Sequence, residues 1–141
     1  MAPIEKASPA EGQRSEVDWI AGLLIQGKRE RYRGFLNTPR RRQKFISGLY
    51  HFDDFEPSYV LATPPHGGPV EIEAALRALG APDKCYLIST NSLLDQRVLL
   101  IGEALPAVSD ASNGTIVCCL PGRLAFFQGE VPHNRCILSV R

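Results

Sequence analysis

The order of the predicted elements indicates an α+β fold, in which N-terminal helices pack on a mixed, mainly antiparallel sheet of four to six strands. Apolar positions at helical spacing dominate residues 15–52, and short strand-like runs follow, with one or two helices between them. A Pro-Gly pair, Pro121-Gly122, joins two of these runs. Pro presets the first central turn position and Gly allows a positive φ at the second, so the pair predicts a hairpin at the centre of the sheet.

The two runs beside this turn are apolar at successive positions, over residues 116–120 and 124–127. Strands with two apolar faces are usually covered on both faces, which places this hairpin in the interior of the sheet. We therefore expect Val117, Cys118 and Phe126 to be buried.

The N-terminal half is predicted to be helical. Its apolar spacing predicts a helix over about residues 15–26 and a second helical piece that extends to about residue 36. Thr38 and Pro39 predict the start of the next helix, with Thr38 as the N-cap and Pro39 at the first helical position. We expect this helix to end near residues 50–52.

The second half alternates strands with short helices. A strand over residues 59–62 precedes a helix over residues 70–79, which Gly80 is suited to end. If residues 59–62 and 85–89 paired in parallel, the segment between them would be a right-handed crossover. The remaining predicted elements are a short strand or the lead-in to a helix over residues 98–101, a weak helix over residues 102–108 and a last strand over residues 136–140.

The chain is expected to form one domain. Residues 1–14 lack apolar periodicity, and we interpret them as a flexible tail ahead of a globular domain over residues 15–141. No apolar run approaches the length of a membrane span, so we predict no membrane partner. The N-terminus lacks the basic and apolar regions of a signal peptide. We therefore expect a cytoplasmic protein.

Four cysteines accompany the predicted strands, and none belongs to a C-x-x-C pair. Adjacent side chains on a strand point to opposite faces, so Cys118 and Cys119 are poorly placed to share a metal. We interpret all four cysteines as buried, reduced thiols, and we predict neither a metal site nor a cofactor. They are Cys85, Cys118, Cys119 and Cys136.

Charge is distributed unevenly along the chain. Residues 28–44 contain eight of its 16 Lys and Arg residues and one acid, Glu30, a net charge of +7. Residues 45–141 carry a net −4 and residues 1–27 a net −2, so the total of +1 conceals a strongly dipolar chain.

This basic segment carries the leading functional hypothesis, a binding module for an anionic partner. Arg40 and Arg41 would occupy the first turn of a helix, where cations are mildly unfavourable unless an anion is bound. The partner would be a polyanion such as nucleic acid, or an acidic protein surface. A solvated basic face without a ligand is the alternative. The candidate binding residues are Arg33, Arg40, Arg41, Arg42 and Lys44. We expect that Arg40, Arg41 and Arg42 can be replaced together without unfolding the protein.

Catalytic candidates are few. His51, Asp53 and Asp54 place an imidazole and two carboxylates within four residues, so a small enzyme is a second hypothesis, although these residues also suit a polar helix end. Asn91 and Asp95 follow a predicted strand and form a weaker candidate. No phosphate loop, nucleophile elbow or H-E-x-x-H motif occurs.

A third hypothesis is a homodimer subunit without catalysis. Its contact would use a sheet edge or an apolar helix face, with Trp19 and Phe55 as the candidate exposed aromatic residues.

Overall fold

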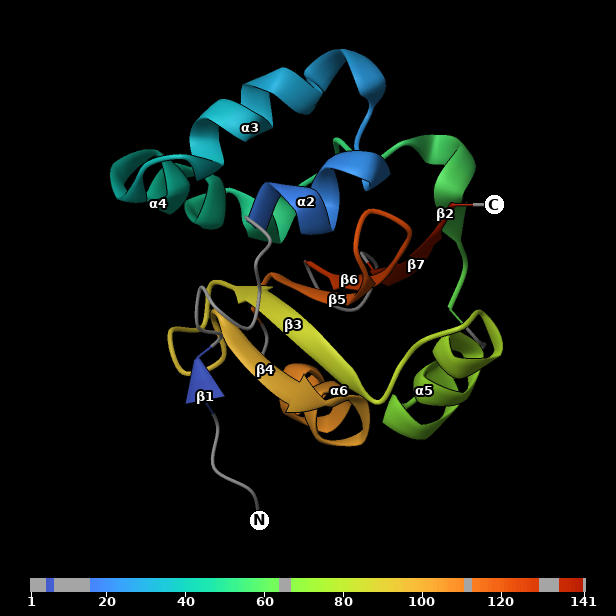
Figure 1. Cartoon of the computed structure of the whole chain (residues 1–141). Helices are drawn as coiled ribbons and strands as arrows, with labels where there is room; N and C mark the ends of the chain where they lie inside the picture. Colours follow the sequence, from blue (N-terminus) through green and yellow to red (C-terminus); the bar gives the residue numbers. More distant parts are fainter. Residues whose placement is uncertain (1–4, 7–15, 64–66, 111–112, 130–134, 141) are drawn as a thin grey trace.

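The computed structural model describes residues 5–6, 16–63, 67–110, 113–129 and 135–140 (Figure 1). Its α-helices are α2 (Glu16–Ile20), α3 (Arg29–Leu36), α4 (Pro39–Ser47), α5 (Pro69–Ala78) and α6 (Ile101–Asp110). Short 3-10 helices span Ala21–Leu23, Gln26–Lys28, Leu49–His51 and Pro57–Tyr59. The strands are β1 (Glu5–Lys6), β2 (Val60–Leu61), β3 (Lys84–Ser89), β4 (Arg97–Leu100), β5 (Thr115–Leu120), β6 (Leu124–Gln128) and β7 (Arg135–Ser139).

The α+β prediction is confirmed. Within the described residues the strands form one sheet in the order β1-β4-β3-β5-β6-β7-β2, and every described ladder is antiparallel. Five strands of four or more residues make up its body, and two-residue strands lie at its edges. The conditional parallel pairing of residues 59–62 with 85–89 is wrong, because β2 pairs with β7 at the edge far from β3.

Helices cover both faces of the sheet (Figure 1). On β5, Ile116 and Cys118 pack into a core with the N-terminal helices, whereas Val117 and Cys119 pack into a second core with α5 and α6. The successive apolar positions of β5 and β6 follow from this arrangement, since a strand between two helical layers buries both of its faces. Phe126 is 1% exposed.

Residues 121–123 connect β5 and β6 and lie against α2. Gly122 has a φ of 66°, and its N–H donates to the carbonyl of Trp19 at 2.9 Å. A Cβ on Gly22 would lie 2.5 Å from the carbonyl oxygen of Gly122. Glycine is therefore required at position 22, because the two backbones approach too closely for any side chain.

The first helix is shorter than predicted. It ends at Ile20, continues as a 3-10 turn and gives way to extended backbone at Leu24, which bridges Phe55. The Ile25 N–H donates to Asp54 O at 2.9 Å, and the Glu56 N–H donates to Leu23 O at 2.9 Å. These long-range backbone bonds replace the helical ones, so local spacing alone predicted too long a helix.

The predicted tail and helix cap are described only in part. Glu5 and Lys6 pair with Val98 and Arg97 of β4, so this pair is strand rather than flexible tail. The rest of residues 1–14, and the predicted cap Ser15, lie outside the described residues. Among the described helices, none is long and apolar enough to cross a membrane.

The four cysteines are free thiols placed in the strands, three of them buried and Cys136 half-buried. Burial raises the pKa of Cys119 to about 12 and that of Cys136 to about 11. Because the thiolate is the reactive form, these thiols are expected to be inert at neutral pH.

We predict that a thiol-specific reagent labels the native protein slowly and labels four thiols after denaturation without reductant. A chelator should leave the melting temperature unchanged. Fewer than four accessible thiols in denaturant, or a chelator-dependent loss of stability, would contradict the assignment of structural thiols.

Candidate functional site

The basic segment folds as two helices with a short connection. Thr38 caps α4 as predicted, its hydroxyl accepting from the Arg41 N–H at 3.3 Å, and Pro39 is the first helical residue. Phe45 and Ile46 of α4 and Tyr32 of α3 are buried in the core on this side of the sheet. The buried stripes leave the opposite sides of both helices facing solvent.

The structure divides the eight cations of this segment into two groups. Three are engaged within the fold: Lys28 Nζ donates to Asp54 at 2.8 Å, Arg29 Nε to Leu24 O at 3.3 Å, and Arg42 to two carboxylates. The other five are exposed. They are Arg31, Arg33, Arg40, Arg41 and Lys44, and we call them the basic surface.

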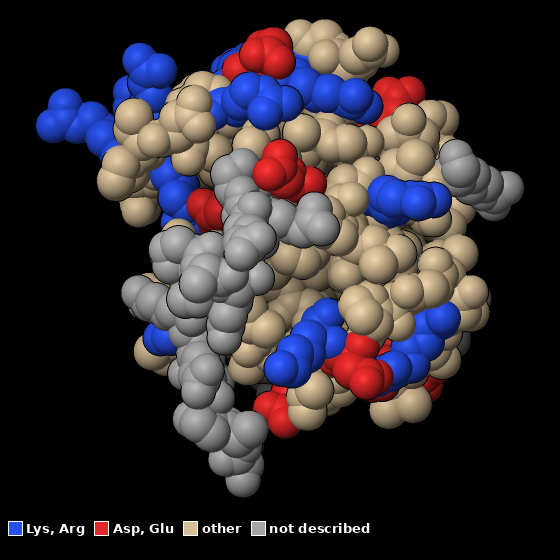
Figure 2. All heavy atoms as spheres, in the orientation of Figure 1, with Lys and Arg blue, Asp and Glu red and all other residues tan. Residues whose placement is uncertain are grey.

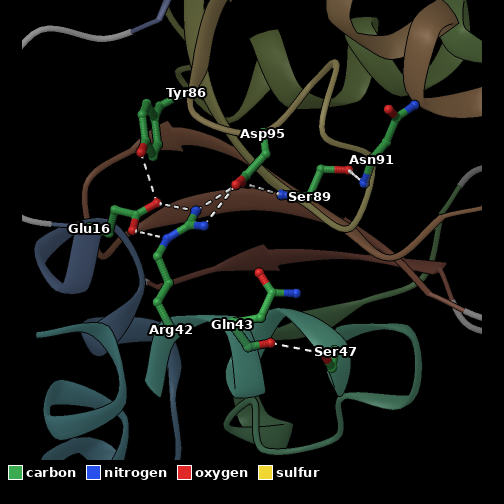
Figure 3. Close-up of polar contacts among 8 residues, drawn as sticks. All are labelled: Glu16, Arg42, Gln43, Ser47, Tyr86, Ser89, Asn91 and Asp95. Carbon is green, nitrogen blue, oxygen red and sulfur yellow. Dashed lines mark hydrogen bonds and ion pairs between the residues drawn. The ribbon is translucent and has the colours of Figure 1, made fainter. Parts of the chain in front are cut away.

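Arg42 bridges two acidic residues that are far apart in the sequence (Figure 3). Its Nε donates to Glu16 Oε1 at 2.5 Å and its Nη2 to Glu16 Oε2 at 2.7 Å. Its Nη1 and Nη2 donate to Asp95 at 2.7 and 2.8 Å. Tyr86 of β3 donates its hydroxyl to Glu16 at 2.8 Å, and Asp95 accepts from the Ser89 N–H at 3.0 Å. This network joins α2, α4, β3 and the β3–β4 loop.

The network is mostly removed from solvent. The side chains of Arg42, Glu16 and Asp95 are 14%, 13% and 17% exposed. Burial acts to lower the pKa of Arg42, but its hydrogen bonds with Glu16 and Asp95 outweigh burial and raise that pKa above its ordinary value. Arg42 is therefore charged and fully engaged. Although we predicted it as a binding residue, its guanidinium does not belong to the basic surface.

Within residues 28–44, the five cations of the basic surface are accompanied by one carboxylate, Glu30. A second exposed carboxylate, Asp53, comes from outside this segment and lies near Tyr32. Glu30 contacts Arg33 through an exposed ion pair of 3.4 Å, which contributes little to stability. Arg31 lies over the rings of Tyr32 and Phe35, with its Cζ 5.8 and 5.7 Å from their centroids. Figure 2 shows Lys and Arg side chains gathered over the end of the molecule that α3 and α4 form. The exposed charges of residues 28–44 sum to +4, since Glu30 offsets one of the five cations.

The predicted catalytic residues have separate surroundings. Asp54 is buried and accepts from Lys28 and from the Tyr32 hydroxyl, whereas His51 and Asp53 are exposed. The ring of His51 also packs edge-on against Tyr50. Across the described part of the chain, no three His, Cys, Asp or Glu residues are grouped so that they could hold a metal. His66 and His133 lie outside the described residues.

Asp54 has a structural role in this arrangement. Burial acts to raise its pKa, but the hydrogen bonds from Lys28 and Tyr32 outweigh burial and lower the pKa below its ordinary value. Burial and the bond to Asp54 raise the pKa of Tyr32, which therefore remains a hydrogen-bond donor at neutral pH. The Asp54 carboxylate thus anchors the start of α3 to the segment that follows α4.

We predict that this anchor is lost in acid. Because the pKa of Asp54 is lower in the folded than in the unfolded protein, its contribution to stability is complete above the unfolded pKa of about 4 and disappears as the pH falls through the folded value. Urea unfolding at pH 7 and pH 3 should therefore show a larger loss of stability for Asp54→Asn, relative to the native protein, at pH 7 than at pH 3. An equal difference at both pH values would refute this linkage.

Sequence reasoning missed the partners of Arg42. Nothing local to Glu16 or Tyr86 distinguishes them, since they lie 26 and 70 positions from their partners in the network. Asp95 was noticed only as a polar residue after a strand.

The expectation that Phe55 is an exposed contact residue is wrong, because Phe55 is 6% exposed. Trp19, the other aromatic residue proposed for a dimer contact, stacks on Tyr86 with ring centroids 5.6 Å apart.

Comparisons of the chain with protein-family models, with curated proteins and with solved structures found no match.

Proposed function

We propose that this protein is a cytoplasmic binding module that holds an anionic partner on the basic surface of α3 and α4. The proposal rests on the way in which the fold divides the eight cations of residues 28–44 into engaged and exposed side chains. Three of them bond to other groups of the fold, and the other five are exposed to solvent, with Glu30 as the one acidic residue of the same segment. The four free thiols are consistent with a reducing compartment.

The position of Arg40 and Arg41 strengthens the proposal. Both residues lie in the first turn of α4, where the helix dipole is positive and an exposed cation costs about 0.3–1 kcal/mol. A bound anion reverses the sign of this term, because the helix end and the two guanidinium groups then attract the same charge. The surface therefore gains most from a ligand with several negative groups.

We predict that Arg40→Gln/Lys44→Gln weakens binding to heparin, which serves as a polyanion probe. Both side chains are exposed on one side of α4, so their loss should reduce retention without changing the fold. The matched control is Lys84→Gln/Arg123→Gln, which removes the same charge at two exposed positions in β3 and in the turn between β5 and β6. The measurement is the salt concentration that elutes each variant from a heparin column. Equal elution of the two variants, or no retention of the native protein at low salt, would refute the proposal.

A further inference from the structure

We infer that the anionic partner is double-stranded DNA and that α4 enters its major groove. This inference rests on the proposed function above and assigns it a ligand class. It follows from the residues that α4 exposes, from the residue types that the basic surface lacks, and from the dimensions of the helix.

The exposed side of α4 consists of residue types that contact base edges or phosphates in protein–DNA complexes. Arg40, Gln43, Lys44 and Ser47 are all exposed, and their spacing of three or four positions places them on one side of the helix, opposite Phe45 and Ile46. Arg and Lys pair with guanine edges and phosphates, Gln pairs with adenine, and Ser contacts either. α4 contains no acidic residue that would repel a phosphate.

The basic surface lacks an apolar anchor. The exposed large hydrophobic residues in the described part of the chain are Val60, Val70, Leu79, Leu93 and Leu100, and none belongs to α3 or α4. Protein–protein interfaces usually have a desolvated core of aromatic or aliphatic side chains. A surface of five cations without such a core fits a polyphosphate better than it fits an acidic protein.

The surface also lacks stacking groups. In the two helices, which the structure describes completely, the aromatic residues are Tyr32, Phe35 and Phe45. Tyr32 and Phe45 are buried, and the half-buried Phe35 packs against the core and is covered by Arg31. Proteins that hold single strands stack bases on exposed aromatic rings. The ligand is therefore expected to be a duplex.

The dimensions of α4 suit the major groove of B-DNA. An α-helix with its side chains is about 10–12 Å in diameter, which matches the groove width of about 12 Å, and the nine residues of α4 would extend roughly 13.5 Å along the groove. α3 precedes α4 after only two residues, Asn37 and Thr38, an arrangement close to the two-helix units that dock in this groove. In Figure 1, α4 forms the outer end of the helical layer, so a duplex can approach it. In this arrangement Arg31 and Arg33 of α3 contact phosphates beside the groove.

The experiment measures fluorescence anisotropy of four labelled probes over a series of salt concentrations: a 20-base-pair DNA duplex, an RNA duplex of the same sequence, the single DNA strand and poly-glutamate. The DNA duplex should bind most tightly, by roughly tenfold over the RNA duplex, whose deep and narrow major groove excludes a helix. With three to five phosphate contacts, the slope of log K against log salt for the DNA duplex is expected to be roughly −3 to −4.5.

Two single variants distinguish contacts to base edges in the groove from general electrostatic attraction to the phosphates. Lys44→Gln should make the slope less steep by about one, because one phosphate contact is lost. Gln43→Ala removes no charge, so it should weaken binding to the DNA duplex while the slope and the heparin retention stay unchanged. The Gln43→Ala variant and the native protein are also compared on a pool of duplexes with randomised sequence. If Gln43→Ala binds that pool as tightly as the native protein does, the placement of α4 in the groove is overturned.

The results separate this inference from the proposal on which it rests. Equal affinity for the DNA and RNA duplexes, or preference for poly-glutamate or the single strand, overturns the DNA assignment, while heparin retention that depends on Arg40 and Lys44 leaves the anion-binding proposal standing. Absence of binding to all four probes and to heparin at low salt, where electrostatic attraction is strongest, refutes both.

Discussion

Replacing Phe126 with Ala is expected to lower the free energy of unfolding by about 3–5 kcal/mol, the range for removing a buried phenyl ring from a core. Phe126 lies in β6, opposite Val117 of β5 on one side and Ile137 of β7 on the other. It is 1% exposed and belongs to the core beneath α5 and α6. Two strands and two helices hold this site in place, so it cannot collapse to fill the cavity.

Urea unfolding of the Phe126→Ala variant measures this effect, and Leu93→Ala is the control. Leu93 is 72% exposed in the β3–β4 loop, so its truncation should change stability by less than about 0.5 kcal/mol. Phe126→Leu should fall between the two, because it leaves a smaller cavity. A loss for Phe126→Ala as small as that for Leu93→Ala would mean that this core is not packed as described.

The elements with strong local signals could be predicted from the sequence. Thr38 and Pro39 mark the start of α4 because the cap and the fixed φ of proline are local properties. The doubly apolar runs of β5 and β6 indicated that both faces of these strands are covered, since burial on both faces leaves no polar positions. Gly80, at φ 105°, lies just after α5, where an end to the helix was expected.

The pairing of distant segments could not be predicted in this way. The first helix stops at Ile20 because residues 54–56 supply backbone partners to Leu23 and Ile25, a contact between segments about 30 positions apart. The edge position of β2 has the same origin, because a two-residue strand carries too little pattern to specify its neighbour.

At the candidate site, the sequence could not indicate which of three successive arginines would be exposed. Arg40, Arg41 and Arg42 are indistinguishable in a sequence of three arginines. Helical geometry turns successive side chains by about 100°, so one of the three faces inward while its neighbours face solvent. Which one faces inward depends on Phe45 and Ile46, and what it meets there depends on Glu16 and Asp95. The basic composition therefore predicted a charged surface but not its members.

The structure also changes what is expected of substitutions at Arg42. We expected that Arg40, Arg41 and Arg42 could be replaced together without unfolding the protein. Removing Arg42 leaves the carboxylates of Glu16 and Asp95 mostly buried, near each other and without their cation. A test of binding should therefore change Arg40 and Lys44 and leave Arg42 in place.

Arg42→Met is expected to destabilise the protein by about 3–5 kcal/mol, the range for removing one partner from a buried ion pair. The value should lie toward the lower end, because some solvent reaches all three side chains and lessens the cost of the remaining charges. Met keeps the apolar stem of Arg, so the loss reports the guanidinium and not the packing. Arg41→Met is the control, since it removes the same group from the adjacent exposed position and should change stability by less than about 0.5 kcal/mol.

A second pair of variants identifies the cause of this loss. If the cost comes from two carboxylates without a cation, Glu16→Gln/Asp95→Asn in the Arg42→Met background should recover much of the stability, because neutral amides cost less to bury than carboxylates. The same two changes in the native background should be destabilising, because they leave the Arg42 charge without its counter-ions. This reversal of sign appears in a double-mutant cycle measured by urea unfolding. Additive effects, with no recovery in the Arg42→Met background, would show that the loss does not come from uncompensated carboxylates, and would refute the joining of α2 and the β3–β4 loop through charge.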